Sequence, residues 1–289
     1  MANQTAEEVK VNIGDIANGM DELTKGNLNY RFDVAADSEF AEICATFNRL
    51  AERLQESENQ VKQQKDEMML GITHDLGTPL TSIQAYAEGI LDGVANTPEK
   101  QKHYLEMIKG KAEDIQSLVT QIFMFSELKR EDYPCHPISI RMDQALNNLI
   151  ETHRKDYETR GLSIHASLSD TVCLVDLEYL DRILINIAEN SIKYRNNDHG
   201  NLKIFMETDD KYCTLTFQDD GPGVSEEALP HLFEVFYRTD PARSMPGKGS
   251  GIGLAIVKSL MEKLGGSVIA QNGNHGGLKI QLIFRRITS

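Results

Sequence analysis

The first 130 residues of the chain carry apolar side chains at alternating steps of three and four residues, which is the spacing of a coiled-coil seam. A first seam ends before Gly26, and a polar connector over residues 27–38 leads into a second seam. The seam positions are Val9, Ile13, Ile16, Met20 and Leu23, followed by Phe40, Ile43, Phe47, Leu50 and Leu54. Because a short helix with one apolar stripe cannot bury that stripe alone, we expect the two helices to pack together and against a second copy of the chain, as a parallel helical bundle.

The second register continues beyond Leu54 and predicts one long helix that runs past residue 90. Its next seam positions, two of them polar, are Ser57, Val61, Gln64 and Met68. Another helix begins with Thr97 as its cap and Pro98 at the first helical position. The apolar stripe of that helix is Leu105, Ile108, Ala112, Ile115, Val119 and Ile122. Together these segments predict an antiparallel helical hairpin, and two such hairpins form a dimeric four-helix bundle.

After residue 130 the pattern changes, and a segment with two prolines (REDYPCHP, residues 130–137) is typical of a linker. Beyond it the sequence predicts helices interleaved with short strands. The expected helices are 143–160, 178–195 and 252–264, and the expected strands are 162–168, 172–175, 202–208, 212–218, 267–271 and 278–284. This order predicts one α/β sandwich domain in which helices cover a sheet.

Charge and cysteine content exclude several classes of function. Acidic residues outnumber basic residues by 44 to 30, and the net charge of −14 argues against nucleic acid or an anionic lipid surface as a general partner. The four cysteines have no paired spacing, so neither a disulfide framework nor a zinc site is indicated, and a reducing compartment fits. No run of about 18 apolar residues predicts a membrane span, and the polar start is unlike a secretion signal.

His74 lies on the wrong face of the long helix for a core residue. At about 100° per residue, the apolar positions of this segment fall within an arc of about 80°, and His74 lies about 160° from its middle. These apolar positions are Ile72, Leu76, Leu80, Ile83, Ala87 and Ile90. We therefore expect the imidazole to face water, with Asp75 beside it and Thr78 one turn further on.

Pro79 removes the amide hydrogen that would bond the carbonyl of Asp75, so we expect the helix to bend at or just after His74. Gly71 and Gly77 weaken the helix further. Taken alone, this pattern fits an ordinary surface histidine on a kinked helix equally well.

Two further groups of residues suit a nucleotide. Asn186, Asn190 and Lys193 share one helix face, where amide oxygens suit Mg²⁺ and an ammonium suits phosphate, although a solvated polar face explains them as well. A strand leads directly into Asp219-Asp220-Gly221-Pro222-Gly223, where a carboxylate can accept a hydrogen bond from an exocyclic amine and glycines let the backbone approach a base; the alternative is a tight turn.

A third group is the segment from Gly247 to Leu254 (GKGSGIGL), which opens a helix. Free backbone amides and the positive end of a helix favour phosphate. The segment fits neither a P-loop nor a dinucleotide-binding fingerprint, so we expect a different phosphate cradle.

The string GITHDLGTPL over residues 71–80 closely resembles the phosphoacceptor box of sensor histidine kinases, with Gly77 in place of the usual Arg or Lys. In chain order, residues 186–190 (NIAEN), 219–223 (DDGPG), 232–238 (LFEVFYR) and 249–254 (GSGIGL) resemble the N, G1, F and G2 boxes of the same kinases. Their nucleotide domain shares its fold with gyrase-like clamps. The first 60 residues are similar, by pattern only, to the relay bundle called a HAMP domain.

The resemblance implies a homodimeric kinase in which Mg²⁺-ATP binds the C-terminal domain. Asn190, assisted by Asn186, would hold the metal, and Asp219 would read adenine. The candidates on the phosphate side would be Lys193, Tyr194 and Arg238, and the other nucleotide-binding positions would be Gly221, Gly223, Gly249, Gly251, Gly253 and Leu254. In this family the segment 222–250 forms a mobile lid over ATP.

His74 would attack the γ-phosphoryl group while Asp75 accepts or orients its other ring proton. The phosphohistidine would then donate to an aspartate of a response regulator, and Thr78 would orient water for dephosphorylation of that regulator. The implied division is a HAMP-like relay (1–58), a dimerisation and phosphotransfer domain (59–131), a linker (132–138) and a catalytic ATP-binding domain (139–289). We expect this chain to be the cytoplasmic part of a sensor anchored in the cell membrane through a missing upstream segment.

Two alternatives belong to other classes of function. The first is an ATP-driven clamp of the gyrase kind, in which no side chain is phosphorylated. The second is a signalling scaffold that binds a nucleotide without phosphotransfer.

Overall fold

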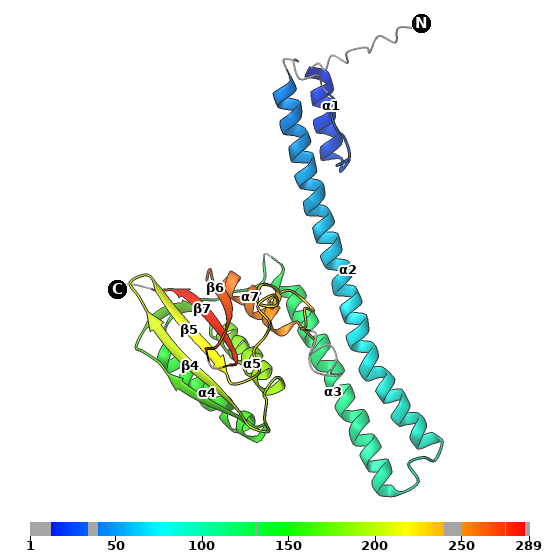
Figure 1. Ribbon diagram of the computed structural model, residues 1–289, viewed down its shortest axis with the longest axis vertical. Coiled ribbons are helices and arrows are strands. Elements are labelled where there is room, and N and C mark those ends of the chain that lie inside the picture. Colours follow the sequence, from blue (N-terminus) through cyan, green and yellow to red (C-terminus); the bar gives the residue numbers. More distant parts are fainter. Residues whose placement is uncertain (1–12, 34–39, 131, 240–249, 275, 287–289) are drawn as a thin grey trace. The chain divides into compact units, whose positions relative to one another are not determined.

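The computed structural model describes residues 13–33, 40–130, 132–239, 250–274 and 276–286. The chain divides into two compact units, Met1–Leu70 and Gly71–Ser289. The long helix α2 (Ala41–Leu91) contributes to both (Figure 1). No helix among the described residues is long and apolar enough to cross a membrane.

The first unit joins helix α1 (Ile13–Thr24) to the beginning of α2 through an aromatic connector. Phe32 lies between the helices: its ring meets Phe47 of α2 edge-on at 4.8 Å, and its backbone exchanges two hydrogen bonds with the amide of Asn48. A Cβ on Gly19 of α1 would collide with the Phe32 ring, so this glycine lets the connector approach. The expectation of a purely polar connector was wrong, because Tyr30 and Phe32 complete the small core.

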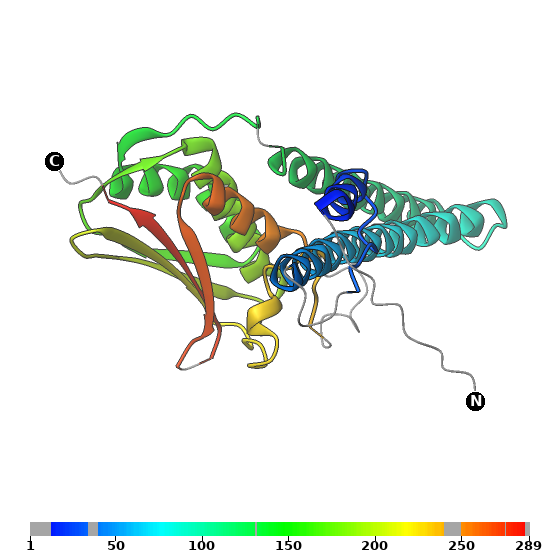
Figure 2. The same ribbon diagram turned by 90° about the horizontal axis from the view of Figure 1, so that it is seen from above.

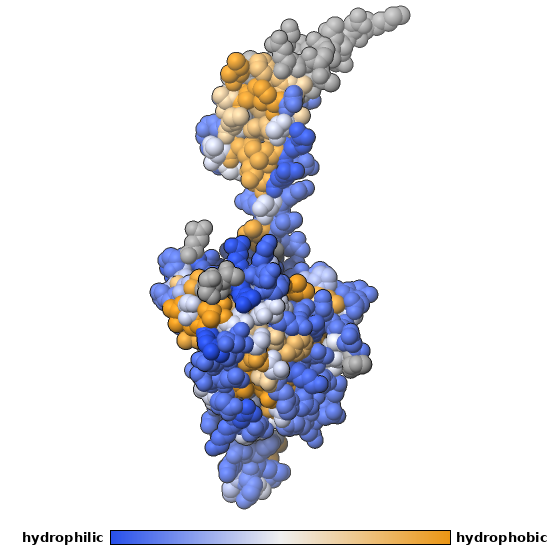
Figure 3. All heavy atoms as spheres, turned by 90° about the vertical axis from the view of Figure 1, so that its left-hand side faces the viewer, coloured by the Kyte–Doolittle hydropathy of each residue, from blue (hydrophilic) through white to orange (hydrophobic). Residues whose placement is uncertain are grey.

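The described seam positions of the first unit divide into two sets, and Val9 lies outside the described residues. One set is buried or half-buried in the core that also holds Cys44: Ile16, Leu23, Phe40 and Phe47. The other set stays exposed: Ile13, Met20, Ile43, Leu50 and Leu54. Apolar side chains accordingly gather on the surface of α1 and the N-terminal part of α2 (Figure 3).

In the second unit, the C-terminal part of α2 and helix α3 (Pro98–Leu128) form the expected hairpin (Figure 1). The Thr97 hydroxyl accepts a hydrogen bond from the Lys100 amide, which confirms the predicted cap. At the turn, Tyr86 of α2 meets Tyr104 of α3 edge-on at 5.1 Å, and the absence of a side chain on Gly89 makes room for Tyr104.

The remainder of the second unit is an α/β domain with two sheets. Strands β2 (Leu162–Ser167), β4 (Gly200–Thr208), β5 (Tyr212–Asp219), β7 (Leu278–Arg285) and β6 (Ser267–Asn272) form a five-stranded sheet in that order. Only the β2–β4 pair is parallel. Strands β1 (Ile138–Arg141) and β3 (Val172–Val175) form a separate antiparallel pair. The sequence predicted neither β1 nor a second sheet, since β1 has four residues of which three are exposed.

Helices α4 (Met142–Thr159), α5 (Leu177–Lys193) and α7 (Gly253–Lys263) cover one face of the large sheet (Figure 2). Strand β4 buries alternate side chains against these helices, as the period of two requires, whereas β5 buries Leu215, Thr216 and Phe217 in succession. The fully buried layer includes Leu180, Ile183, Leu202, Leu215, Val257 and Leu260. A short 3-10 helix, η1 (Leu229–His231), precedes residues 232–238.

Candidate active site

The acceptor candidate His74 projects into solvent from the second unit's part of α2. Its side chain is 73% exposed, as the helical wheel predicts, and Nδ1 lies 3.0 Å from Oδ1 of Asp75. The Asp75 side chain is only 14% exposed. The two neighbours therefore differ: the ring is open to a reactant, and the carboxylate that touches it is largely covered.

Helix α2 continues through Pro79 without a break in its helical assignment. Three hydroxyl groups donate to carbonyls four residues earlier: Thr78 to His74, Thr81 to Gly77 and Ser82 to Thr78. Such bonds give carbonyl groups near a helical proline an additional donor and tend to bend a helix. Thr78 is thereby tied to the turn that carries His74.

The nucleotide candidates come together at the edge where α5, β5 and the N-terminus of α7 meet. The Asn186 amide donates to the carbonyl of Arg182 at 2.7 Å, and its Oδ1 lies 3.1 Å from the place where a Cβ on Gly253 would stand. The carbonyl of Tyr194 lies 2.9 Å from the corresponding place on Gly221. The segments resembling the N, G1 and G2 boxes are therefore neighbours, and side chains on these glycines would crowd their junction.

Asp219 ends β5 with a carboxylate held by the backbone. Its Oδ1 accepts hydrogen bonds from the amides of Gly221 and Leu278, both at 2.9 Å. Burial nevertheless raises the pKa of Asp219, and these two bonds oppose the rise. A desolvated carboxylate with both described bonds on one oxygen is suited to accept a further hydrogen bond from a base edge.

Lys193 and Tyr194, at the end of α5, are both half-buried. Burial lowers the pKa of Lys193, while the charges of Glu189 and of Asp114 on α3 act in the opposite direction. Burial raises the pKa of Tyr194. The charge of Arg238 lowers the pKa of both groups.

The nucleotide domain also contacts the helices that carry the acceptor. The ring of Phe236 packs on Gly71 of α2, where a Cβ would lie 2.7 Å from the ring. The Phe236 amide donates to the carbonyl of Gly251, and the Ser250 hydroxyl donates to Gln121 of α3. Nη1 of Arg238 lies 3.7 Å from Oδ1 of Asp75. The segment resembling the F box and the segment that opens α7 therefore meet the helical hairpin beside His74.

The sequence included Phe236 only within the segment that resembles the F box, treated Gly71 as a weak point of the helix and as the start of the string that resembles the phosphoacceptor box, and did not single out Gln121. Phe236 has a φ of 63°, which is uncommon for a residue with a side chain and is compatible with a fixed local structure. Gly249, and with it Gly247 and Lys248 of the expected phosphate cradle, lie outside the described residues. The described end of that segment keeps Gly251 at a positive φ, where it approaches the backbone of Phe236.

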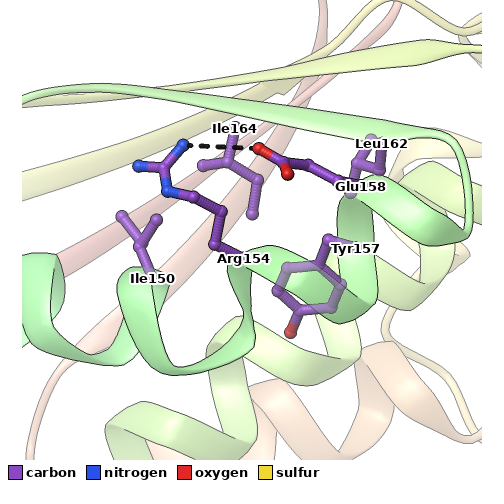
Figure 4. Close-up of a pocket in the computed structure, with 6 residues that line it drawn as sticks. All are labelled: Ile150, Arg154, Tyr157, Glu158, Leu162 and Ile164. Carbon is purple, nitrogen blue, oxygen red and sulfur yellow. Dashed lines mark ion pairs between the residues drawn. The ribbon is translucent and has the colours of Figure 1, made fainter.

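Other features of the described chain offer no competing site. Among the described residues, no three His, Cys, Asp or Glu side chains are grouped as metal ligands. The four cysteines are free. A hollow of about 10 Å³ is lined by the Arg154–Glu158 ion pair, Tyr157 and three aliphatic side chains, and could hold no more than one water molecule (Figure 4). A shallow groove of about 290 Å³ lies between the end of α3 and Lys263, away from the predicted site residues.

Comparison with protein families gives three matches in chain order. Residues 11–56 match the HAMP domain, and residues 64–131 match the His Kinase A (phospho-acceptor) domain. Residues 175–287 match the histidine kinase-, DNA gyrase B- and HSP90-like ATPase. The first two matches contain the two helical parts, and the third contains the residues predicted to bind the nucleotide.

Among curated relatives, the chain is 30% identical over 267 residues to the signal transduction histidine-protein kinase BaeS of Escherichia coli, which covers 92% of this chain and 55% of the relative. It is 29% identical to the sensor protein GtcS of Aneurinibacillus migulanus, over 88% of this chain and 69% of the relative. It is 26% identical to the sensor histidine kinase CpxA of E. coli, over 92% of this chain and 56% of the relative. The chain thus spans little more than half the length of BaeS and CpxA.

Solved structures share the architecture at lower identity. The Acinetobacter baumannii histidine kinase AdeS superposes with a TM-score of 0.59 at 22% identity, over 74% of this chain and 98% of that chain. The histidine kinase ThkA, in complex with the response regulator protein TrrA, gives a TM-score of 0.62 at 16% identity, over 80% of this chain and 66% of that chain. These likenesses confirm the expected fold class, a helical N-terminal region followed by an α/β domain of the ATPase type.

Proposed function

Because the chain belongs to the sensor histidine kinases and carries their HAMP, phospho-acceptor and ATPase domains, we propose that it transfers the γ-phosphoryl group of Mg²⁺-ATP to His74 and from there to an aspartate of a response regulator. One observation carries this proposal: an exposed imidazole, paired with a covered carboxylate, lies beside a nucleotide-type domain that contacts the same helix through Phe236 and Arg238. A clamp or a scaffold would have no use for this arrangement.

On the nucleotide side, Asp219 accepts a hydrogen bond from the exocyclic amine of adenine. The amide oxygens of Asn190 and Asn186 would hold Mg²⁺, which would supply positive charge against the phosphates. Lys193 and Tyr194 face the phosphates, and Gly221, Gly223, Gly249, Gly251, Gly253 and Leu254 let the backbone approach the nucleotide. The half-buried position of Lys193 supports this role, because a poorly hydrated ammonium interacts strongly with phosphate oxygens.

On the acceptor side, Nδ1 of His74 carries the ring proton and donates a hydrogen bond to the carboxylate of Asp75. This leaves the lone pair of Nε2 free to attack the γ-phosphorus in line with the leaving ADP oxygen. As the bond to phosphorus forms, positive charge develops on the ring, and the carboxylate of Asp75 stabilises that charge. Because phosphoryl transfer passes through a loose transition state, positioning and charge neutralisation supply most of the rate.

The kinase proposal is tested by incubating the chain with radiolabelled Mg²⁺-ATP. We expect a protein-bound label that acid removes and alkali preserves, that is lost in His74→Gln, and that is strongly reduced in Asn190→Ala. ATP turnover without any label would instead support a clamp. Signalling that persists in Asn190→Ala would support a scaffold.

We also propose that the chain dephosphorylates its regulator, with the Thr78 hydroxyl orienting the attacking water. The support is local: Thr78 follows His74 by one turn and is bonded to its carbonyl at 3.2 Å. Thr78→Ala should lower the rate of regulator dephosphorylation by at least tenfold, the scale expected when a positioned catalytic group is lost. Thr81→Ala removes a similar back-bonded hydroxyl from the next turn and is the matched control. Equal rates in the two variants would contradict this role of Thr78.

The remaining assignments follow from the same family membership. We propose a relay over residues 1–58, a dimerisation and phosphotransfer domain over 59–131, a linker over 132–138 and a catalytic domain over 139–289. The exposed set of seam residues in α1 and α2 supports a homodimer. An upstream sensor segment anchored in the cell membrane is proposed by analogy with the longer relatives.

A further inference from the structure

The structure assigns to Arg238 a role on the acceptor side of the reaction, which rests on the proposed kinase activity. We propose that Arg238 is a positioning residue that acts through Asp75: its guanidinium holds the Asp75 carboxylate against Nδ1 of His74, so that Nε2 is the nitrogen presented to ATP. The sequence placed Arg238 among the residues that face the phosphates.

One oxygen atom of Asp75 lies close to both His74 and Arg238. Oδ1 of Asp75 lies 3.0 Å from Nδ1 of His74 and 3.7 Å from Nη1 of Arg238. The Arg238 side chain is 11% exposed and the Asp75 side chain 14% exposed, so water screens this pair poorly. The pair of Arg130 with Asp132 offers a contrast: it is closer, at 2.8 Å, but both side chains are more than half exposed, and such surface pairs impose little order.

The backbone brings Arg238 to this position. Phe236, two residues earlier, packs on Gly71, which lies three residues before His74 and therefore close to the same face of α2. Gly251 accepts the Phe236 amide and has a positive φ, and a Cβ there would collide with the Phe236 backbone. The contact that docks the nucleotide domain on α2 therefore also places the guanidinium of Arg238 beside Asp75.

Without Arg238, the carboxylate could turn toward water, and the proton of His74 would distribute over both ring nitrogens. The fraction of chains with a free Nε2 would fall, although ATP would still bind. A contact with the phosphates of bound ATP in the ground state makes a different prediction, because loss of such uniform binding raises KM and leaves kcat unchanged.

The first test is a double-mutant cycle with Arg238→Ala, Asp75→Asn and the double variant in the full chain. We expect Arg238→Ala to lower the autophosphorylation rate at saturating ATP by about tenfold, as for loss of a positioned proton acceptor, with KM for ATP changed less than twofold. The double variant should be no slower than Asp75→Asn, because Arg238 acts through Asp75. The proposal would be overturned if the rate losses of the two single variants added fully in the double variant. It would also be overturned if Arg238→Ala raised only the KM for ATP.

Two variants control for structural damage. Arg238→Lys keeps the charge and should recover part of the lost rate. Arg182→Ala removes another arginine contact between the nucleotide domain and the hairpin, its bond to the sulfur of Met124, and should leave the cycle unchanged. If Arg238→Lys and Arg182→Ala both behave like Arg238→Ala, the effect comes from a weaker contact between the nucleotide domain and the hairpin. That result would overturn the proposal.

The second test needs no catalysis. In the unreacted full chain with ¹⁵N-labelled histidine, the His74 signal is assigned by its loss in His74→Gln. We expect mostly the tautomer with the proton on Nδ1, and a lower share of it in Arg238→Ala. The same share in both proteins would overturn the proposal. A wild-type chain that shows this change but does not autophosphorylate would refute the proposed kinase function while leaving the positioning by Arg238 intact.

Discussion

The α/β domain and the helical hairpin of the second unit bury their apolar residues to different degrees. In the α/β domain, the helix and strand faces meet within one chain, and Leu260 is 0% exposed at their centre. In the hairpin, Phe123 is 67% exposed, and Leu80, Leu105 and Val119 are each about half exposed. The α/β domain is therefore complete in one chain, whereas the hairpin has an apolar surface that we expect a second copy to cover.

The same difference extends to the chemistry. The nucleotide candidates are held by close backbone contacts within the α/β domain, such as Tyr194 against Gly221. The acceptor is one exposed ring on a helix, and it is oriented by Asp75 and by the segment that carries Arg238. A donor site held by backbone contacts and an open acceptor that is oriented from outside suit the proposed kinase, whose acceptor would also meet a second protein.

The largest expected effect sharpens the contrast in burial. Leu260→Ala should lower the free energy of unfolding of the α/β domain by about 2–5 kcal/mol, through lost burial and a residual cavity. Phe123→Ala should change it by less than about 0.5 kcal/mol, as for surface substitutions, and should instead weaken self-association. Urea unfolding and sedimentation velocity measure the two quantities. A large loss of domain stability in Phe123→Ala would break the comparison.

The next effect concerns the desolvated carboxylate of the donor site. Burial raises the pKa of Asp219, so its ionised form destabilises the folded domain. The free energy of unfolding should therefore fall as the pH rises through the range just above the ordinary aspartate value of about 3.9.

Asp219→Asn keeps an oxygen for the amides of Gly221 and Leu278. It should raise the melting temperature at neutral pH and remove this pH dependence. ATP affinity should drop by about 10- to 100-fold, the scale of a lost hydrogen bond to a charged group. Unchanged affinity in a calorimetric titration would show that Asp219 does not read the base.

A smaller effect tests how the open acceptor is oriented. Gly71→Ala places a Cβ 2.7 Å from the Phe236 ring, which must then move away from α2. We expect a severalfold slower autophosphorylation with unchanged affinity for ATP, because the nucleotide site lies within the α/β domain. Gly110→Ala in α3 meets no atom within 4 Å and is the matched helical control. Equal rates in the two variants would mean that the Phe236 contact does not serve the reaction.

The smallest effect concerns the departure from the usual phosphoacceptor box. A Cβ on Gly77 meets no atom within 4 Å, so Gly77→Lys can be accommodated without repacking. It restores a positive charge near the acceptor and should raise the rate of phosphotransfer to the regulator about twofold, a gain that added salt removes. A gain that persists at high salt would point to a cause other than charge.

The sequence predicted most of the secondary structure because its signals are local. The Thr97 cap, the Pro98 start and the alternation within the strands placed element ends to within about two residues, as expected for strongly patterned segments. The strand at Ile138–Arg141 escaped notice because it is short and mostly exposed. Tyr30 and Phe32 lie in a connector with no periodicity, so their place in a core depends on the helices that they join.

The candidate site was predictable only in its composition. Motif order indicated which residues belong to the nucleotide and acceptor sides, and their catalytic roles stay predictions. The contact of Phe236 with Gly71 and the position of Arg238 beside Asp75 arise from docking of one domain on another. No local sequence pattern predicts such docking. A phenylalanine does not by itself favour a positive φ, so the sequence offered no sign of this conformation at Phe236.

In the proposed reaction, Asp75 occupies one ring nitrogen of His74 and leaves the other for ATP. The most direct test of this arrangement is nuclear magnetic resonance of the chain with ¹⁵N-labelled histidine after reaction with Mg²⁺-ATP, which identifies the nitrogen that bears phosphorus. We predict phosphate on Nε2 of His74 and on no other histidine. Phosphate on Nδ1 of His74, or on a different residue, would contradict the account.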